Sequence, residues 1–216
     1  AQALEEVVRH CRPRSQWSPS YALANCYRSG RDTVGFHSDF LSTLGPRPII
    51  VGLSLGATRL FRLRQGSKTI TIPMPHNSAV VMWDDCQEEW QHSVPRQADS
   101  VIDAHRTAGR TRISLTFRMA RPELASRRIN CKCGRSTVLR CKSGKYYLAC
   151  SPMTTKQCGF WTPCAWAEEE AARMREELKE TAMHSEPQNH VEPSQARGGT
   201  PKQKWSTLGV ASGTLS

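Results

Sequence analysis

A histidine and an aspartate lie two residues apart in the segment 35–39, a short polar break in apolar sequence. If this segment is a strand, the imidazole of His37 and the carboxylate of Asp39 project from the same face. His92, in a second polar break at residues 89–95, is the best candidate for a third ligand from an opposing strand. Two histidines and one carboxylate leave three coordination positions open, which suits non-haem Fe(II) oxygenases. The alternative is a His-x-Asp pair that occurs by chance.

A second polar pattern occupies the segment 112–118, where polar and apolar residues alternate strictly, as in a strand. The polar face consists of Arg112, Ser114, Thr116 and Arg118, and the apolar face of Ile113, Leu115 and Phe117. A buried arginine needs an anionic partner, since an unpaired interior guanidinium is costly. A dicarboxylic cosubstrate would fit between the two arginines. The alternative is an exposed strand face with ordinary surface arginines.

Together these segments resemble the AlkB-type Fe(II)/2-oxoglutarate dioxygenases, from about Tyr21 to Arg118. Five blocks carry the resemblance in the family's order: Asn25-Cys26-Tyr27 with Ser29-Gly30, Gly35-Phe36-His37-Ser38-Asp39, Leu53-Ser54-Leu55-Gly56 with Arg59-Leu60-Phe61, Trp90-Gln91-His92-Ser93-Val94-Pro95, and the Arg112–Arg118 strand. The resemblance implies that iron is held by His37, Asp39 and His92, and that 2-oxoglutarate is contacted by Asn25, Tyr27, Arg112, Thr116 and Arg118.

The activity implied by the resemblance is oxidative demethylation of N-alkylated bases in nucleic acid, as in DNA repair. Two residues depart from the family's pattern: Ser114, where the family usually has Asn, and Phe40, where it often has an acidic residue. The second departure bears on the base preference, because that acid reads the substrate in the family. Two other functions stay open. One is an oxygenase that acts on a protein or a small molecule, and the other is an inactive nucleic-acid-binding protein.

Short strands dominate the first half of the chain and predict an all-β fold, a two-sheet jelly roll over residues 21–120. The resemblance implies the same architecture, the family's double-stranded β-helix. The apolar spacing of Leu4, Val7, Val8 and Cys11 predicts a helix over residues 1–12. We interpret residues 1–20 as the remnant of an N-terminal helix or lid. The expected strands are 20–28, 33–37, 48–55, 58–64, 68–73, 79–83, 89–94 and 111–119.

The net charge of +11 is distributed unevenly: between His105 and Lys145 there are twelve Lys or Arg and one acidic residue. A concentrated basic segment favours a polyanionic partner, and single-stranded DNA is our first expectation. The alternative is a solvated charged loop. No stretch approaches 18 apolar residues, so we expect no membrane span. The chain reads as a segment of a longer protein, and a DNA-repair function would place it in the nucleus.

Six of the nine cysteines fall between Cys131 and Cys164, after an expected basic linker at 121–129. Cys131, Cys133, Cys150 and Cys158 suit a closed tetrahedral zinc site, with Cys141 and Cys164 outside it. A disulfide framework is the alternative, although it requires an oxidising compartment. The segment 130–165 also resembles the GRF-type zinc finger, through Gly134, Gly144-Lys145-Tyr146-Tyr147, Cys150 and Cys158-Gly159-Phe160-Trp161.

The aromatic residues of this segment alternate with basic ones, which is typical of single-strand binding by stacking and phosphate contact. They are Tyr146, Tyr147, Phe160 and Trp161, among Arg135, Arg140, Lys142 and Lys145. The alternative is that the aromatics form the module's own core. Thr162-Pro163 predicts the start of a helix that occupies 166–182, an appendage with little apolar surface. The tail, 183–216, is expected to be disordered. The sequence leaves open DNA or RNA, the lesion and the oligomeric state.

Overall fold

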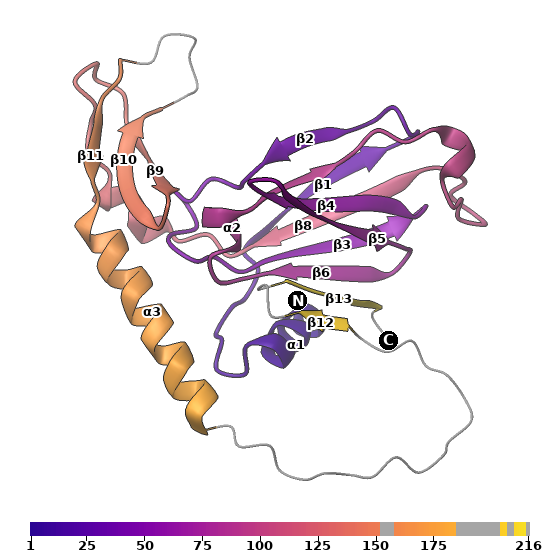
Figure 1. Ribbon diagram of the computed structural model, residues 1–216, viewed down its shortest axis with the longest axis horizontal. Coiled ribbons are helices and arrows are strands. Elements are labelled where there is room, and N and C mark those ends of the chain that lie inside the picture. Colours follow the sequence, from indigo (N-terminus) through magenta and orange to yellow (C-terminus); the bar gives the residue numbers. More distant parts are fainter. Residues whose placement is uncertain (152–157, 185–203, 207–209, 215–216) are drawn as a thin grey trace.

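The computed structural model describes residues 1–151, 158–184, 204–206 and 210–214, with side chains described up to residue 180. Two sheets face each other in a jelly roll, as Figure 1 shows, and all eight expected strands are confirmed to within two residues at each end. The main sheet contains, in spatial order, β1 (Tyr21–Tyr27), β8 (Arg112–Arg118), β3 (Ile50–Gly56) and β6 (Ser78–Met82). The opposing sheet contains β2 (Val34–His37), β7 (Gln91–Val94), β4 (Arg59–Gln65) and β5 (Lys68–Met74).

Apolar side chains from both sheets fill the space between them. The cluster includes Ile50 and Met82 of the main sheet and Phe61 and Leu63 of the opposing sheet. The short helix α2 (Cys86–Glu89), which the sequence did not predict, closes one end of this core with Cys86. A single turn of 3-10 helix, η1 (Asp99–Val101), lies in the long connection between β7 and β8.

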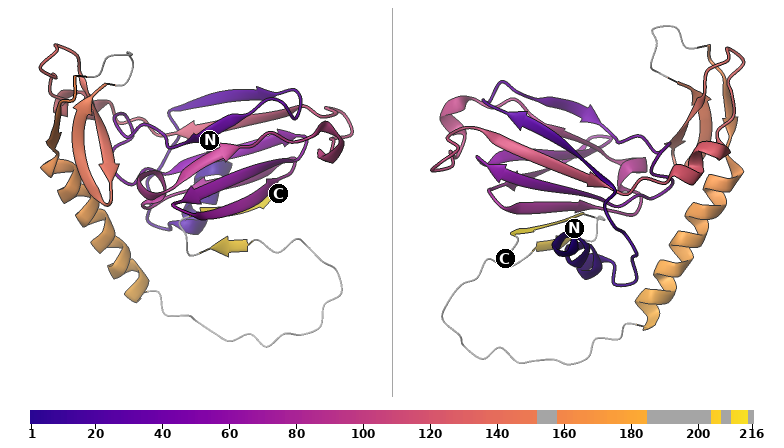
Figure 2. Two further views of the ribbon diagram at one scale, coloured as in Figure 1. Left: turned by 45° about the horizontal axis from the view of Figure 1, so that its top comes forward. Right: turned by 180° about the vertical axis from the view of Figure 1, so that it is seen from behind.

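Helix α1 (Gln2–Cys11) confirms the expected N-terminal helix. Its residues Leu4 and Val8 are buried against Val51 and Val81 of the main sheet, with Val7 and Cys11 half-buried beside them. Figure 2 shows α1 under this sheet, on the side away from the opposing sheet. Residues 1–11 are therefore part of the jelly roll's own packing rather than a cover over its mouth.

A third, small sheet stands at one end of the jelly roll (Figure 1) and contains β11 (Trp161–Pro163), β10 (Lys145–Cys150) and β9 (Thr137–Lys142). The expectation that Thr162-Pro163 starts a helix is wrong, because both residues pair with β10 in an edge strand. Proline is tolerated at the end of an edge strand, where no partner needs its missing N–H. Helix α3 (Ala165–His184) begins after Cys164 and buries Ala167 and Ala171 against β10, so it is more than an appendage.

The segment expected as a basic linker is packed against both parts. It forms the 3-10 helix η2 (Pro122–Arg127), whose Leu124 is buried. Arg121 forms ion pairs with Glu123 and with Glu170 of α3. A flexible linker would leave these groups in water, so residues 121–127 are structured.

Part of the expected disordered tail also forms strands. β12 (Lys204–Ser206) pairs with β13 (Val210–Thr214), which pairs antiparallel with the edge strand β6. An edge strand offers unpaired N–H and C=O groups, and a chain segment can satisfy them whatever its side chains. The expectation of disorder is wrong for these residues, and for 185–203, 207–209 and 215–216 it lies outside the described residues.

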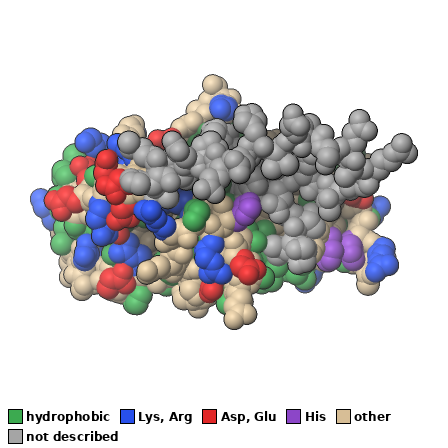
Figure 3. Space-filling model, turned by 90° about the horizontal axis from the view of Figure 1, so that it is seen from below, with side chains coloured by type: hydrophobic (Ala, Val, Ile, Leu, Met, Phe, Trp, Pro, Cys, Tyr) green, Lys and Arg blue, Asp and Glu red, His purple; other side chains and the backbone are tan. Residues whose placement is uncertain are grey.

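Folding disperses the basic stretch between His105 and Lys145. Arg112 and Arg118 line an internal cavity, whereas Arg121 is neutralised by two carboxylates. On the face shown in Figure 3, Lys and Arg side chains are interleaved with Asp and Glu at the end that carries α3. Among the described residues, no helix has the length and apolar character needed to cross a bilayer.

Candidate active site

The pairing of β2 with β7 brings the two histidines of the expected triad together. His37 lies directly opposite His92 in the antiparallel register, and the ring centroids are 4.3 Å apart. Asp39 follows β2 by two residues, and its Oδ1 lies 4.0 Å from Nε2 of each histidine. The three side chains that the sequence selected therefore converge on one point.

The surroundings of the two imidazoles suit metal binding. His37 Nδ1 lies 2.8 Å from the carbonyl oxygen of Gly35, which can only accept, so Nδ1 donates this hydrogen bond and Nε2 is the nitrogen left to face a metal ion. Burial lowers the pKa of His92 from 6.5 to about 4, and the nearby His37 adds to this shift. His92 is therefore neutral at physiological pH, the form that binds a metal ion.

The carboxylate of Asp39 is oriented by two neighbours from other elements. Arg118 Nε donates to Asp39 Oδ2 at 2.7 Å, and the backbone N–H of Asp39 donates to Gln87 Oε1 of α2 at 2.8 Å. One oxygen is thus held by the arginine, and the other faces both histidines. Octahedral metal–ligand bonds of about 2.1 Å require neighbouring ligand atoms about 3 Å apart, so binding an ion draws these side chains together by about 1 Å. Two imidazole nitrogens and one carboxylate oxygen fit Fe(II).

The guanidinium of Arg112 is the most deeply buried charged group that lines the site. It is only 2% exposed, its Nε donates to Ser54 Oγ at 2.8 Å, and its Nη2 donates to Ser114 Oγ at 3.3 Å. Its Nη1 is buried and has no hydrogen-bond partner among the described residues. Burial lowers the pKa of Arg112 from 12.5 to about 10, because the cation is taken out of water without a matching anion. An incoming carboxylate would accept a hydrogen bond from Nη1 and would balance the positive charge, so this position fits an oxo-acid cosubstrate.

One cavity of about 480 Å³ contains all of these groups. The register of β1 against β8 places Tyr27 opposite Arg112 and Asn25 opposite Ser114, and Leu23 lies opposite Thr116. All eight residues expected to bind iron or 2-oxoglutarate line this cavity: Asn25, Tyr27, His37, Asp39, His92, Arg112, Thr116 and Arg118. The iron ligands and the four polar residues of β8 thus face the same space. Contacts to 2-oxoglutarate remain a prediction for Asn25, Tyr27 and Thr116.

Two supporting residues were missed at the level of sequence. Ser54 is fully buried and accepts the hydrogen bond from Arg112, and a lone serine between Leu53 and Leu55 was a usable signal. Gln87 is buried and accepts the hydrogen bond from the backbone of Asp39, 48 residues away in the chain. Nothing local in the sequence marks such a contact.

The two departures from the family's pattern lie at different depths. Ser114 still provides an oxygen to Arg112, as described above. Phe40 is 62% exposed at the mouth of the cavity, where the half-exposed Tyr21 and Leu23 also lie. The mouth is therefore apolar and partly aromatic.

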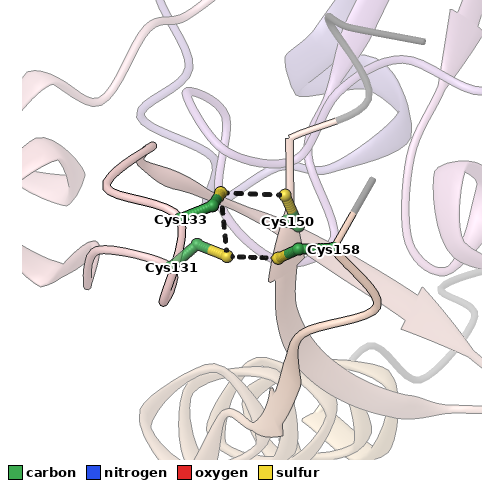
Figure 4. Close-up of side chains that lie close together, drawn as sticks. All are labelled: Cys131, Cys133, Cys150 and Cys158. Carbon is green, nitrogen blue, oxygen red and sulfur yellow. Dashed lines mark hydrogen bonds between the residues drawn. The ribbon is translucent and has the colours of Figure 1, made fainter. Parts of the chain in front are cut away.

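The four expected cysteines of the small sheet form a second cluster (Figure 4). The Sγ–Sγ distances are 2.8 Å for Cys131–Cys158, 3.4 Å for Cys131–Cys133 and 3.7 Å for Cys133–Cys150. Tetrahedral Zn–S bonds of about 2.3 Å correspond to about 3.8 Å between sulfurs, so the cluster suits a zinc ion after a small adjustment. Hydrogen bonds from the backbone and the side chain of Arg135 lower the pKa of Cys133 to about 6, which favours the thiolate that zinc binds.

The remaining residues of this module separate into core and surface. All nine cysteines are free thiols, and Cys164 and the half-buried Cys141 pack in the module's apolar cluster, outside the group of four. Tyr146 is also buried there. Trp161 is 65% exposed and meets the half-buried Tyr147 edge-on, with ring centroids 6.4 Å apart. The aromatics thus serve partly as core and partly as surface.

Comparison with known proteins agrees with this geometry. The family described as "2OG-Fe(II) oxygenase superfamily" matches residues 1–118. Alpha-ketoglutarate-dependent dioxygenase alkB homolog 3 from Bos taurus is 38% identical over 112 residues, 47% of this chain and 36% of that protein. The Homo sapiens protein of the same name is 37% identical over the same shares. DNA oxidative demethylase ALKBH2 from Homo sapiens is 26% identical over 125 residues, 53% of this chain and 45% of that protein.

The chain therefore spans little more than a third of the length of the alkB homolog 3 proteins that it matches. A solved structure entitled "The structure of OsALKBH1" shares 21% identity over 55% of this chain and 59% of its own, with a TM-score of 0.41, too low to support an inference. The matched family covers the strands that build the cavity, and its chemistry requires the metal ligands found there. The chain belongs to the 2OG-Fe(II) oxygenase superfamily and is related to the AlkB homologues.

Proposed function

We propose that this protein oxidatively demethylates N-alkylated bases in nucleic acid, as in DNA repair, and that its cysteine module binds zinc and assists single-strand binding. The observation that carries the proposal is the pairing of an iron site with an apolar mouth. Phe40, Tyr21 and Leu23 expose large apolar side chains around a cavity whose inner wall carries the iron ligands and the polar residues of β8 among apolar side chains. A base taken out of its stack offers two flat apolar faces to such a mouth and its polar edge to the interior.

The roles of the residues follow from their positions. His37, Asp39 and His92 would hold Fe(II), which, with dioxygen and 2-oxoglutarate, supplies hydroxylation of the N-methyl group. Arg112 would bind one carboxylate of 2-oxoglutarate through its free Nη1, while Arg118 keeps Asp39 oriented. The products are succinate, carbon dioxide, formaldehyde and the unmethylated base. With a base bound, Phe40 at the mouth would shield the reacting methyl group from water.

A groove supports the involvement of the cysteine module, which we propose is of the GRF type. A hollow of about 370 Å³ connects Asp39 and Phe40 with Arg140 and Tyr147 of the small sheet. The exposed Trp161 lies edge-on to the half-buried Tyr147, and Arg140 beside these rings suits phosphate contact and base stacking along a single strand. Glu88 and Glu89 line the opposite part of the hollow, towards the jelly roll. A strand whose target base enters the cavity can therefore continue across this groove.

The test is formaldehyde release from oligonucleotides that carry N-methylated bases, as single-stranded DNA, duplex DNA and RNA. We expect release that requires Fe(II) and 2-oxoglutarate and that is highest on single-stranded DNA. The His92→Ala variant is the matched control, because it keeps the nucleic-acid surface and loses an iron ligand. No release from any oligonucleotide by protein that still converts 2-oxoglutarate to succinate would favour a protein or small-molecule substrate. Absence of both reactions and of metal binding would indicate an inactive nucleic-acid-binding protein.

A DNA-repair substrate implies a nuclear location in a cell that has a nucleus. Imaging of the tagged full-length protein before and after treatment with an alkylating agent tests this part of the proposal, and exclusion from the nucleus in both conditions would contradict it.

A further inference from the structure

The loop 38–49, between β2 and β3, carries the iron ligand Asp39 and then leaves the jelly roll. Two residues after Asp39, the side chain of Leu41 is only 4% exposed. Its neighbours in the apolar cluster do not belong to the jelly roll: they are Leu139, Tyr146 and Leu148 of the small sheet, Cys164 between β11 and α3, and Ala167 and Ala171 of α3. The oxygenase domain thus contributes a core residue to the cysteine module.

Hydrogen bonds continue this attachment along the next two residues. The backbone N–H of Leu139 in β9 donates to Ser42 Oγ at 2.9 Å. Arg128, which follows η2, donates from Nη2 to the carbonyl oxygen of Ser42 at 3.1 Å. The backbone N–H of Arg121 donates to the carbonyl oxygen of Thr43 at 2.8 Å. Residues 41–43 are therefore held by two segments that follow β8: the connecting segment with Arg121 and Arg128, and the small sheet.

A second link connects the module with α2, which also supports Asp39. Tyr146 Oη donates to Glu88 Oε1 at 2.9 Å, and the same oxygen accepts the backbone N–H of Arg47 at 2.6 Å. The residue before Glu88 is Gln87, whose Oε1 accepts the backbone N–H of Asp39 at 2.8 Å. The loop and its support in α2 thus both contact the small sheet.

The loop also lies close to the segment 121–127, which leads into the module. Gly45 has φ +78°, a backbone conformation that favours glycine, and a Cβ at this position would lie 2.6 Å from Arg121 Nη1 and 3.2 Å from Leu124 Cδ1. The segment 121–127 is thus packed on the loop and is not a free tether.

From these contacts we propose that the cysteine module is a structural part of the iron site, and that Leu41 is a positioning residue for Asp39. Two residues of extended chain span at most about 7 Å, so a displacement of Leu41 is transmitted to Asp39. The module is too small to hold its core without its metal, so zinc occupancy fixes the surface on which Leu41 packs. The inference rests on the iron site and on the proposed binding of zinc by the module, and not on the choice of substrate.

The experiment measures Mn(II) binding to the full chain by electron paramagnetic resonance, because Mn(II) prefers the nitrogen and oxygen ligands of the iron site to thiolates. Zinc content is measured on the same samples. Leu41→Ala and the zinc-site variant Cys133→Ser are compared with the wild-type protein. Cys133 is exposed, so its replacement removes a zinc ligand without opening a core cavity. We expect both variants to bind Mn(II) at least about tenfold more weakly, as for loss of groups that support a metal ligand.

Val8→Ala is the matched control, because it removes a buried aliphatic group from the α1 side of the main sheet and leaves the loop intact. We expect its Mn(II) affinity to equal that of the wild-type protein. If Leu41→Ala does not fold, Ser42→Ala, which removes only the acceptor for Leu139, takes its place. Unchanged Mn(II) affinity in Cys133→Ser after loss of its zinc would overturn the proposal. An equal loss of affinity in Val8→Ala would overturn it as well, since general destabilisation would then explain the effect.

Discussion

Replacement of Arg112 by methionine separates cosubstrate binding from folding. The guanidinium is 2% exposed, with two serine hydroxyls as hydrogen-bond partners and a buried Nη1 that has none among the described residues. Methionine fills a similar volume without a charge. The variant therefore removes the charged hydrogen-bond donor for a carboxylate while it keeps the packing of β8.

The free-energy terms for the protein without cosubstrate nearly cancel. Lowering the pKa of Arg112 from 12.5 to about 10 corresponds to a cost of about 3 kcal/mol for the charged side chain, at about 1.4 kcal/mol per pH unit. The hydrogen bond from this charged group to Ser54 returns about 1.5 to 3 kcal/mol. We therefore expect Arg112→Met to change the free energy of unfolding by no more than about 1.5 kcal/mol. Binding has no such compensation, since removing one partner of a buried charge pair costs about 2 to 5 kcal/mol.

The assay is calorimetric titration of 2-oxoglutarate into protein that contains Mn(II), together with thermal unfolding of both proteins without cosubstrate. We expect the Kd for 2-oxoglutarate to rise about 30-fold or more, at about 1.4 kcal/mol per tenfold. An unchanged Kd would refute the role assigned to Arg112. A large loss of stability with unchanged binding would show that the guanidinium is a structural group.

Arg59 provides the matched comparison. It is also fully buried, but each guanidinium nitrogen has an acceptor: Gln97 Oε1 and the carbonyl oxygens of Ser29, Asp32 and Pro95. Arg59→Met leaves the carbonyl oxygens of Asp32 and Pro95 without their donor, at about 1 to 3 kcal/mol each, whereas Gln97 Oε1 and the carbonyl oxygen of Ser29 each keep a second donor. We expect it to lower the free energy of unfolding by at least about 2 kcal/mol. Equal free energies of unfolding for Arg112→Met and Arg59→Met would show that hydrogen bonding of a buried guanidinium does not determine its contribution to stability.

Three further outcomes test other parts of the structure. Burial raises the pKa of Glu88 from 4.5 to about 7, so its contribution to stability is complete below pH 4.5 and is lost as the pH rises through 7. Between pH 5 and pH 8, the free energy of unfolding measured in urea should change by about 2.5 kcal/mol less in Glu88→Gln than in the wild type, and parallel curves would contradict this. Trp161→Ala should weaken binding to single-stranded DNA by about 1 to 3 kcal/mol in fluorescence anisotropy. Its melting temperature should not change, and unchanged binding would show that this ring is no stacking surface. Gly45→Ala should lower the free energy of unfolding by about 1 to 3 kcal/mol, because of the clash with Arg121 and the positive φ. Unchanged thermal unfolding would mean that the loop adapts freely.

The iron site was predictable because its signals are local. The spacing of His37 and Asp39 selected both residues, although Asp39 lies two residues beyond the end of β2, and strand alternation placed Arg112 and Arg118 on one face of β8. The meeting of His37 with His92 was a hypothesis about distant strands, which the pairing of β2 with β7 confirms. These side chains are polar breaks in apolar strands, so the pattern that forms the fold also marks the site.

The errors concern segments whose structure depends on distant partners. Thr162 and Pro163 have the local preferences of a helix start, but they pair with the open edge of β10 and so form a strand. Residues 210–214 have no amphipathic pattern, yet β6 offers them an unpaired edge. The burial of Leu41 depends on residues about a hundred positions further along the chain, and no local rule predicts it.

The iron site and the proposed zinc site therefore share a scaffold, so binding at one site is coupled to binding at the other. Leu41 completes the apolar core of the small sheet, which is too small to form a core alone. In return, the small sheet holds the loop that carries Asp39 through this packing and through the hydrogen bond to Ser42. A contact that stabilises one partner stabilises the other by the same amount, because coupling free energies are reciprocal. Any factor by which zinc tightens the iron site must equal the factor by which iron tightens the zinc site. A module joined by a flexible linker would give a factor of one, and the packed segment 121–127 argues against that arrangement.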